Sequence, residues 1–359
     1  MGVSEILARY AVQRAHVLVV EVPGCWSLRV ALERQVLSRG WQLAESPADA
    51  DVLVVCGQPG PELGELVDRV WDQLPGPRVR LGLPRIEALD GALDAIQAGL
   101  VDTANHRADA RQRPATPGMD HGDMDHGDMA PHGIPLAGGG EDRDGLEMDV
   151  LHLPLGPVLR HWPAGLVLRC ALQGDVVVGA QASILDGGHV ATRATAAKDD
   201  ARGGTNAWLC DQVCAVLSLA GWPDGAASAR RVRDALIDDG SGEATRPALE
   251  RLRREVFGSR LLRWSLRGVG NVAAQGRGSR ELPEGVVGDV HDRLVRMLDR
   301  ALAGQLATPV TVPALLDHPA ALVGALPDLV TGLDLAAVRL LVASLALDTT
   351  PTREQVAHG

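Results

Sequence analysis

The first third of the chain alternates short apolar runs with helical patterns. The apolar runs are rich in valine and show no polar alternation, as is typical of strands buried on both faces of a parallel sheet; they cover residues 16–22, 51–56 and 78–83. Helical spacing of apolar residues follows each run, at residues 26–37, 63–74 and 86–100. This alternation predicts a small three-layer α/β domain with a parallel sheet, whose ligand crevice lies beyond the carboxyl ends of the strands.

The pattern changes twice after this point. Residues 113–147 are rich in Gly, Pro, Asp and His and have almost no apolar periodicity, which predicts a linker. Two short apolar runs around Gly174 and Asp175 then predict a β-hairpin, and helical patterns dominate from about residue 206 onward. We therefore expect an α/β domain in residues 1–112, a linker in 113–147, and in 148–359 an α+β domain with a short antiparallel sheet and a helix bundle.

Composition narrows the classes of function. The formal charge of −11 argues against a nucleic-acid surface, and Lys198 is the only lysine among the basic residues. There is neither an apolar stretch long enough to span a membrane nor a leader-like start. Five scattered cysteines fit a reducing compartment better than a disulfide framework. We expect a soluble cytoplasmic protein without a transmembrane segment, which could also bind peripherally to the cytoplasmic membrane.

Two motifs in the predicted α/β domain carry a family resemblance. Residues 47–57 read PADADVLVVCG, and residues 74–78 read LPGPR. They resemble the cluster-bearing small subunit of complex I and of nickel–iron hydrogenases. In that family a P-x-x-A-D strand precedes a turn with glycine, and an L-P-x-P-R type turn leads into the next strand.

The second domain carries a matching resemblance. Residues 154–157 (PLGP), 166–169 (LVLR) and 173–178 (QGDVVV) resemble the opening of the quinone-site large subunit of complex I. Residues 257–260, 268–270 and 282–285 are similar to the bundle region of that subunit. The resemblance covers about two thirds of the chain and implies a fused, degenerate homologue of the two neighbouring subunits.

Departures from the family pattern concern the cofactor sites. A 4Fe–4S cluster needs four thiolates. The resemblance places the tandem cysteine pair of the small subunit at Cys25, but Trp26 is its neighbour, and no cysteine lies between Cys56 and Cys170. Cys25 and Cys56 are therefore interpreted as remnant cluster positions, and no intact iron–sulfur site is expected.

The large-subunit half departs in the same way. A nickel site would need two C-x-x-C pairs, but Cys210 and Cys214 are four residues apart on a predicted apolar helix, which favours buried structural thiols. The quinone loop of complex I carries two histidines. The matching residues 156–165 hold one, His161, and the quinone-pocket tyrosine has no counterpart. We interpret His161 as a residue of a remnant quinone loop.

The predicted linker contains an M-D-H-G-D repeat. Thioether sulfur favours Cu(I), whereas imidazole and carboxylate suit Cu(II) or Ni(II), so a copper or nickel site is one interpretation and a solvated spacer is the other. The candidate metal ligands are Met119, His121, Met124, His126, Met129 and His132.

Three hypotheses for function follow. The leading one is a non-catalytic, cluster-less subunit with a structural role in a complex I-like assembly, related to NADH:quinone oxidoreductases or membrane hydrogenases. Its partners would be other subunits of a membrane-associated respiratory-type complex. The second is a copper- or nickel-binding accessory or maturation protein that uses the repeat. The third is an oxidoreductase subunit that completes its site with a partner chain.

Overall fold

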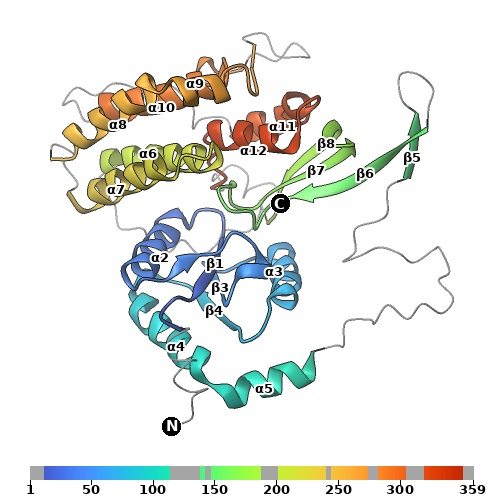
Figure 1. Ribbon diagram of the computed structural model, residues 1–359, viewed down its shortest axis with the longest axis vertical. Coiled ribbons are helices and arrows are strands. Elements are labelled where there is room, and N and C mark those ends of the chain that lie inside the picture. Colours follow the sequence, from blue (N-terminus) through green and yellow to red (C-terminus); the bar gives the residue numbers. More distant parts are fainter. Residues whose placement is uncertain are drawn as a thin grey trace, which may run out of the picture.

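The structure is a computed structural model that describes residues 12–113, 138–141, 147–186, 201–239, 244–273, 282–304 and 319–350. Two units follow one another along the chain (Figure 1). The N-terminal unit comprises residues 12–113, and the C-terminal unit comprises the described residues from 138 onward. The described helices include none that is long and apolar enough to cross a membrane.

The N-terminal unit is built on a parallel four-stranded sheet with the strand order β2-β1-β3-β4. The strands are β1 (His16–Glu21), β2 (Gln42–Leu43), β3 (Val52–Cys56) and β4 (Val79–Leu83). The three predicted apolar strands are confirmed, and every residue of β3 is buried, as expected of a strand covered on both faces. The two-residue β2 was not predicted because it is too short to show a period.

Helices cover this sheet. They are α2 (Trp26–Ser38), η1 (Pro47–Asp49), α3 (Pro61–Gln73), η2 (Ile86–Ala88), α4 (Leu89–Val101) and α5 (Thr103–Gln112). Apolar residues of α2, α3 and α4 pack with the strands in one core. The polar helix α5 has no buried residue and was missed by the apolar pattern, but Asp102 caps its first turn by accepting from the N–H groups of Ala104 and Asn105.

The C-terminal unit opens with an antiparallel sheet in the order β5-β6-β7-β8. Its strands are β5 (Gly138–Glu141), β6 (Glu147–Leu155), β7 (Leu166–Gln173) and β8 (Val176–Ile184). The predicted hairpin is confirmed, with the turn at Gly174 and Asp175. β5 lies inside the expected linker, because a glycine-rich edge strand is held by backbone hydrogen bonds that apolar periodicity does not report. Residues 114–137 and 142–146 lie outside the described residues.

Helices form the rest of the unit: α6 (Ala201–Leu219), α7 (Pro223–Asp239), α8 (Arg246–Gly258), α9 (Arg260–Leu266), η4 (Glu284–Val286), α10 (Val290–Ala303), α11 (Pro319–Val330) and α12 (Leu335–Ser344). α6, α7, α8 and α10 share one core, and α11 and α12 share a second core with the sheet. The fold is thus a parallel α/β unit followed by an α+β unit with an antiparallel sheet and a helix bundle, as predicted.

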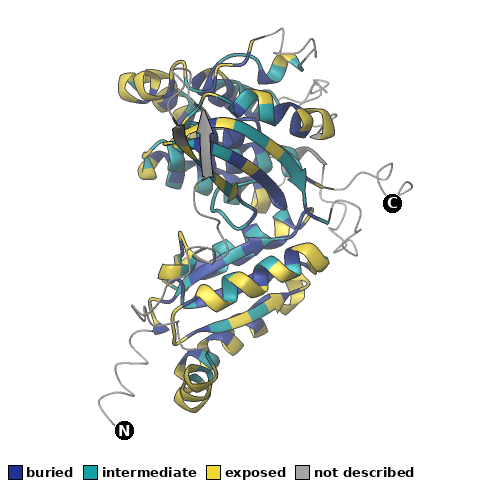
Figure 2. Cartoon of the chain, turned by 90° about the vertical axis from the view of Figure 1, so that its right-hand side faces the viewer, coloured by how far each residue is buried: buried dark blue, intermediate teal, exposed yellow. Residues whose placement is uncertain are grey.

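The two units are stacked, and buried residues line the region where they meet (Figure 2). Trp26 from the start of α2 packs against the core of the bundle, and Val158 from the C-terminal unit packs against the core of the parallel sheet. The contact therefore has apolar parts contributed by both units. It lies at the carboxyl ends of β1 and β3, where a ligand crevice was predicted.

Candidate functional site

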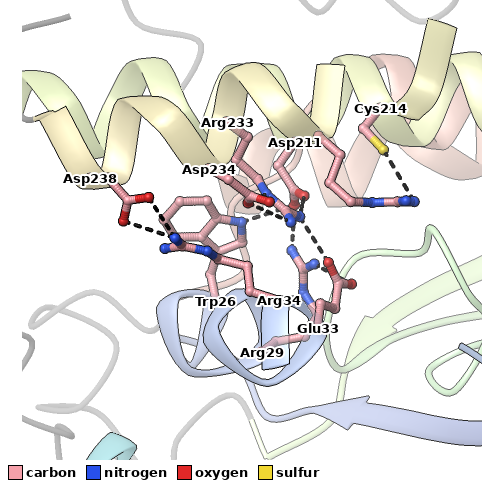
Figure 3. A network of polar contacts seen from close by, with 10 residues as sticks. Trp26, Arg29, Glu33, Arg34, Asp211, Cys214, Arg233, Asp234 and Asp238 are labelled. Atoms are coloured by element: carbon pink, nitrogen blue, oxygen red, sulfur yellow. Dashed lines mark hydrogen bonds and ion pairs between the residues drawn. The ribbon is translucent and has the colours of Figure 1, made fainter. Parts of the chain in front are cut away.

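A buried polar network joins α2 to α6 and α7, and its central residue is Asp211 (Figure 3). The indole Nε1 of Trp26 donates to Asp211 Oδ2 over 2.9 Å, and a guanidinium nitrogen of Arg29 donates to the same oxygen. Arg233 Nη1 donates to Asp211 Oδ1 over 2.6 Å. One carboxylate of the bundle thus binds three donors, two of them from the N-terminal unit. We call this network, completed by Glu21 and Glu33, the joint.

Glu33, in the N-terminal unit, accepts hydrogen bonds from the same two arginines. Its Oε1 accepts from Arg29 Nη1 at 2.7 Å, and its Oε2 accepts from Arg233 Nη1 at 2.8 Å. Arg29 Nε also donates to Glu21 Oε2 over 2.7 Å. The Arg233 side chain is only 1% exposed, so its charge is compensated almost entirely by protein groups.

In the joint, burial and ion pairing shift the pKa values of the carboxyl groups in opposite directions. Burial alone would raise the pKa of the Asp211 carboxyl, but Arg29 and Arg233 hold that pKa well below its ordinary value. The same balance lowers the pKa of Glu33. Burial dominates at Glu21, whose pKa is raised although Arg29 opposes the shift. The joint therefore contains two carboxylates that favour the ionised form and one that resists it.

A second contact caps α3 from the other unit. The carboxylate of Asp186, the second residue after β8, accepts from the backbone N–H groups of Glu62 at 3.2 Å and Leu63 at 3.1 Å. Gly60 gives this carboxylate its space, because a Cβ at Gly60 would lie 2.3 Å from Asp186 Cγ. A helix N-terminus at the carboxyl edge of a parallel sheet is a common anion site, and a side chain of the chain itself occupies it here.

The sequence-predicted His161 lies in the loop between β6 and β7, which packs against the joint. It adopts a left-handed backbone conformation with φ 60° and lines a cavity together with Trp26, Trp208 and Asp211. Burial, reinforced by the charge of Arg160, lowers the pKa of His161 to about 3, so its imidazole is neutral at physiological pH. Within the described part of the chain, no hydrogen bond joins the His161 ring to another residue.

The cavity beside His161 is small. Its volume is about 130 Å³, whereas pockets for small organic ligands commonly enclose roughly 300–1,000 Å³. It has room for several water molecules. Its polar lining includes the guanidinium and carboxylate groups of the joint and the neutral imidazole of His161. The arrangement can bind and orient water, but it is too small to enclose a drug-sized cofactor.

The structure brings Cys25 and Cys56 to the crevice beyond β1 and β3. Both are free and buried, and a Cβ added at Gly57 would lie 2.5 Å from Cys25 Sγ, so the first thiol is tightly enclosed. Burial and then the charge of Glu21 raise the pKa of Cys25 to about 11, and burial also raises the pKa of Cys56 well above its ordinary value. Both are held as protonated thiols, whereas metal ligation uses the thiolate.

The prediction that Cys210 and Cys214 are buried thiols is confirmed. Burial raises the pKa of Cys210 to about 12 and also raises that of Cys214. The residues of the methionine–histidine repeat, Met119 to His132, lie outside the described residues.

Elsewhere in the described ranges, three potential metal ligands gather at the start of α10. Ligand atoms of Asp289, His291 and Asp292 lie within 4.8 Å of one another. Both Asp289 oxygens already accept backbone N–H groups, from Asp292 at 2.9 Å and from Gly268 at 2.8 Å. The Asp292 carboxylate accepts in turn from the N–H of Asp289, which makes a capping box. Helix capping accounts for the two carboxylates.

The residues that make the joint were missed by the sequence analysis. Asp211 stands in a helix whose neighbouring positions are mostly apolar and buried, and Arg233 lies on the face of α7 that buries Ala229 and Leu236. A charged residue on such an apolar stripe needs a partner, and this was the available signal. Nothing in the sequence pattern indicates which residue of the other unit supplies that partner.

The chain was compared with protein-family models, with curated proteins and with solved structures, and none of them matches it.

Proposed function

We propose that the chain is a structural subunit, without an iron–sulfur cluster, of an assembly related to complex I or to membrane hydrogenases. The hydrogen bond from Trp26 to Asp211 carries this proposal. By the resemblance, Trp26 stands where the small subunit would have the second cysteine of its tandem pair. Its indole instead ties the parallel-sheet unit to the helix bundle, so a position used for cofactor binding in the family serves here to hold two units together.

The donor set near this position does not fit a cluster. Cys25 and Cys56 are the thiols at the crevice, and four thiolates are needed. Their raised pKa values favour the neutral thiol. The small cavity beside His161 also supports a structural role, because about 130 Å³ is little space for a quinone head group and the residues that would surround it.

The joint holds the two units of such a subunit in one arrangement, which two separate chains would not ensure. Ion pairs buried between Glu33 of α2 and Arg233 of α7 resist separation, because pulling them apart leaves buried charges without partners. A single covalent chain with this contact presents both units in one fixed arrangement to its neighbours. Its role would be to hold the interface between a membrane arm and the other soluble subunits, on the cytoplasmic side.

Purification from the native host tests this proposal. A chain tagged at its chromosomal locus should co-purify with membrane-embedded subunits after mild detergent extraction and contain no stoichiometric iron or sulfide. The Cys25→Ser/Cys56→Ser variant should keep the same partners, because its thiols hold no cluster, whereas Trp26→Ala should weaken the assembly. A chain that purifies without partners contradicts the proposal. About four iron atoms per chain with a reducible paramagnetic signal would instead favour an oxidoreductase that completes its site with a partner.

The M-D-H-G-D repeat favours a second candidate function. A copper- or nickel-binding accessory protein would use its thioethers and imidazoles, which are ligands of the right softness for these ions. The two functions are separable, because the repeat shares no residue with the joint.

A further inference from the structure

One end of the helix bundle exposes apolar side chains of a size that this chain otherwise keeps mostly inside. On α9, the Leu261 residue is 74% exposed and Trp264 is 79% exposed, and Phe257 at the end of α8 is 53% exposed. Aromatic residues make up only 3% of the chain, and Phe257 is its sole phenylalanine. Large apolar groups gathered on a surface mark an interaction site more often than chance exposure does.

Helical geometry directs Trp264 straight away from the protein. Leu262 and Leu266 of α9 are buried in the bundle core. At about 100° per residue, the mean direction of these two side chains is opposite to that of Trp264. Leu261 lies on one side of Trp264, and Arg260 and Arg267 lie on the other, all of them exposed. The indole therefore protrudes from the surface with cations beside it.

The charge of this segment opposes that of the whole chain. Residues 246–267 contain seven arginines and two glutamates, a formal charge of +5, while the chain carries −11. Arg246 is paired with Glu250, and Arg253 is paired with Asp299. No salt bridge links Arg260, Arg263 or Arg267 to any other described residue. Three guanidinium groups without a salt bridge in the described residues thus belong to the same short helix and its C-cap as the protruding indole.

Phe257 is part of the same surface. The guanidinium of Arg263 lies over its ring at 5.2 Å from the centroid, and Arg263 Nη2 donates to the Phe257 carbonyl oxygen over 2.7 Å. The ring and the cation are thereby held side by side at the protein surface. The helices α8, α9 and α10 lie on the side of the bundle away from the N-terminal unit (Figure 1). The joint therefore leaves this surface uncovered.

We propose that Phe257, Leu261 and Trp264, together with Arg260, Arg263 and Arg267, form a docking surface for a bilayer that contains anionic lipids. We call it the α9 surface. Tryptophan favours the boundary between head groups and acyl chains, and guanidinium groups pair with lipid phosphates. Side chains that protrude this far suit a deformable bilayer better than the flat face of a protein partner. Because the net charge of the chain is negative, an anionic membrane attracts this surface and repels the rest, which fixes one orientation.

The inference goes beyond the proposed function, since it needs no partner subunit. Vesicle sedimentation of the purified full chain tests it. Vesicles of phosphatidylcholine with about one third phosphatidylglycerol should bind the chain at least about tenfold more tightly than phosphatidylcholine alone. About 0.5 M salt should remove most of this difference, since charge attraction is screened.

Paired substitutions locate the binding surface. Leu261→Ser/Trp264→Ser and Arg260→Ser/Arg267→Ser should each weaken binding to the anionic vesicles at least about tenfold. These side chains are exposed, so circular dichroism should show unchanged thermal unfolding. Arg85→Ser/Ile86→Ser removes an exposed arginine and an exposed apolar residue from the N-terminal unit, and as the matched control it should bind like the wild type.

Two results would overturn the inference. The first is the absence of binding to anionic vesicles at millimolar lipid. The second is binding that both α9 variants retain. If the α9 variants instead lose co-purifying subunits while vesicle binding is absent, the surface contacts an acidic protein. If vesicles bind as expected but no subunit co-purifies, the α9 surface stands and the proposed function fails.

Discussion

Asp186 and Glu62 bind each other's backbone across the boundary between the two units. The Asp186 carboxylate accepts from the N–H of Glu62 over 3.2 Å, and the Glu62 carboxylate accepts from the N–H of Asp186 over 3.2 Å. This is the reciprocal pattern of a capping box, made by residues 124 positions apart instead of three. It fixes the first turn of α3 to the end of β8.

Substitutions at two glycines test this contact: Gly60, which precedes α3, and Gly64, which lies within it. A Cβ at Gly60 would lie 2.3 Å from Asp186 Cγ, while one at Gly64 would meet no atom within 4 Å. Gly60→Ala should displace the capping carboxylate and lower the free energy of unfolding by about 1–2 kcal/mol. Gly64→Ala should raise it by about 0.5–1 kcal/mol, because alanine favours helix. Urea denaturation measures both, and equal effects would contradict the cap.

The joint predicts that neutralising two of its carboxylates has opposite effects on stability. Asp211→Asn removes one of the two carboxylates that Arg29 and Arg233 share, and should lower the free energy of unfolding by about 3–5 kcal/mol. Glu21→Gln removes a carboxylate whose burial is only partly compensated, so stability at pH 7 should stay equal or rise. Denaturant titration at neutral pH checks both variants. A larger loss for Glu21→Gln than for Asp211→Asn would contradict this account of the joint.

The carboxyl groups of the joint also determine how the stability of the folded chain falls at acidic pH. The pKa of Asp211 and that of Glu33 are lowered in the folded chain, so these groups stabilise it above their unfolded values, about 4. That contribution is lost as the pH falls from about 4 through the folded pKa values. Glu21 has a raised pKa and acts in the opposite direction, between its unfolded value and the folded one. Wild type should therefore lose stability below about pH 4 more steeply than Asp211→Asn, as acid denaturation measured by circular dichroism would show.

The hydrophobic pattern located the main buried elements because their side chains repeat with the period of a strand or a helix. It found the three apolar strands, the helices that follow them, and the mainly helical character of the chain from about residue 206 onward. It missed β2, β5 and α5, since two-residue strands, glycine edges and polar helices are stabilised by backbone bonds and caps.

The hydrophobic pattern does not predict the joint, for a different physical reason. The partner of Asp211 is set by how two units pack, and Trp26 lies 185 positions away from it. The resemblance directed attention to Cys25 and Trp26, and the structure gives Trp26 a hydrogen-bond acceptor in the bundle. His161 was singled out from a loop motif, and its placement beside the joint depends on the same packing.

The five cysteines should be inert in the folded protein. All are free and buried, and burial raises the pKa of Cys25 and Cys170 to about 11. At pH 8, thiolates should form less than about 1% of each of these two groups. A thiol-reactive chromogenic disulfide should therefore titrate almost no thiol in native protein and five after guanidinium denaturation. Two fast native thiols that disappear in the Cys25→Ser/Cys56→Ser variant would show that Cys25 and Cys56 are accessible as thiolates and would weaken the proposal of a cluster-less subunit.

The methionine–histidine repeat should bind metal without affecting the fold. Met119, Met124 and Met129 offer thioether sulfur for Cu(I), and His121, His126 and His132 offer imidazole for Ni(II) or Cu(II). Replacing the three histidines by alanine should abolish Ni(II) binding and weaken Cu(I) binding, while replacing the three methionines by leucine should weaken only Cu(I) binding. Because the tract has almost no apolar periodicity and shares no residue with the joint, both variants should unfold at the wild-type temperature without metal. Titration calorimetry on the wild type and the two variants decides the point. Absence of heat with millimolar metal, or equal binding by the histidine variant, would show that the tract is a spacer.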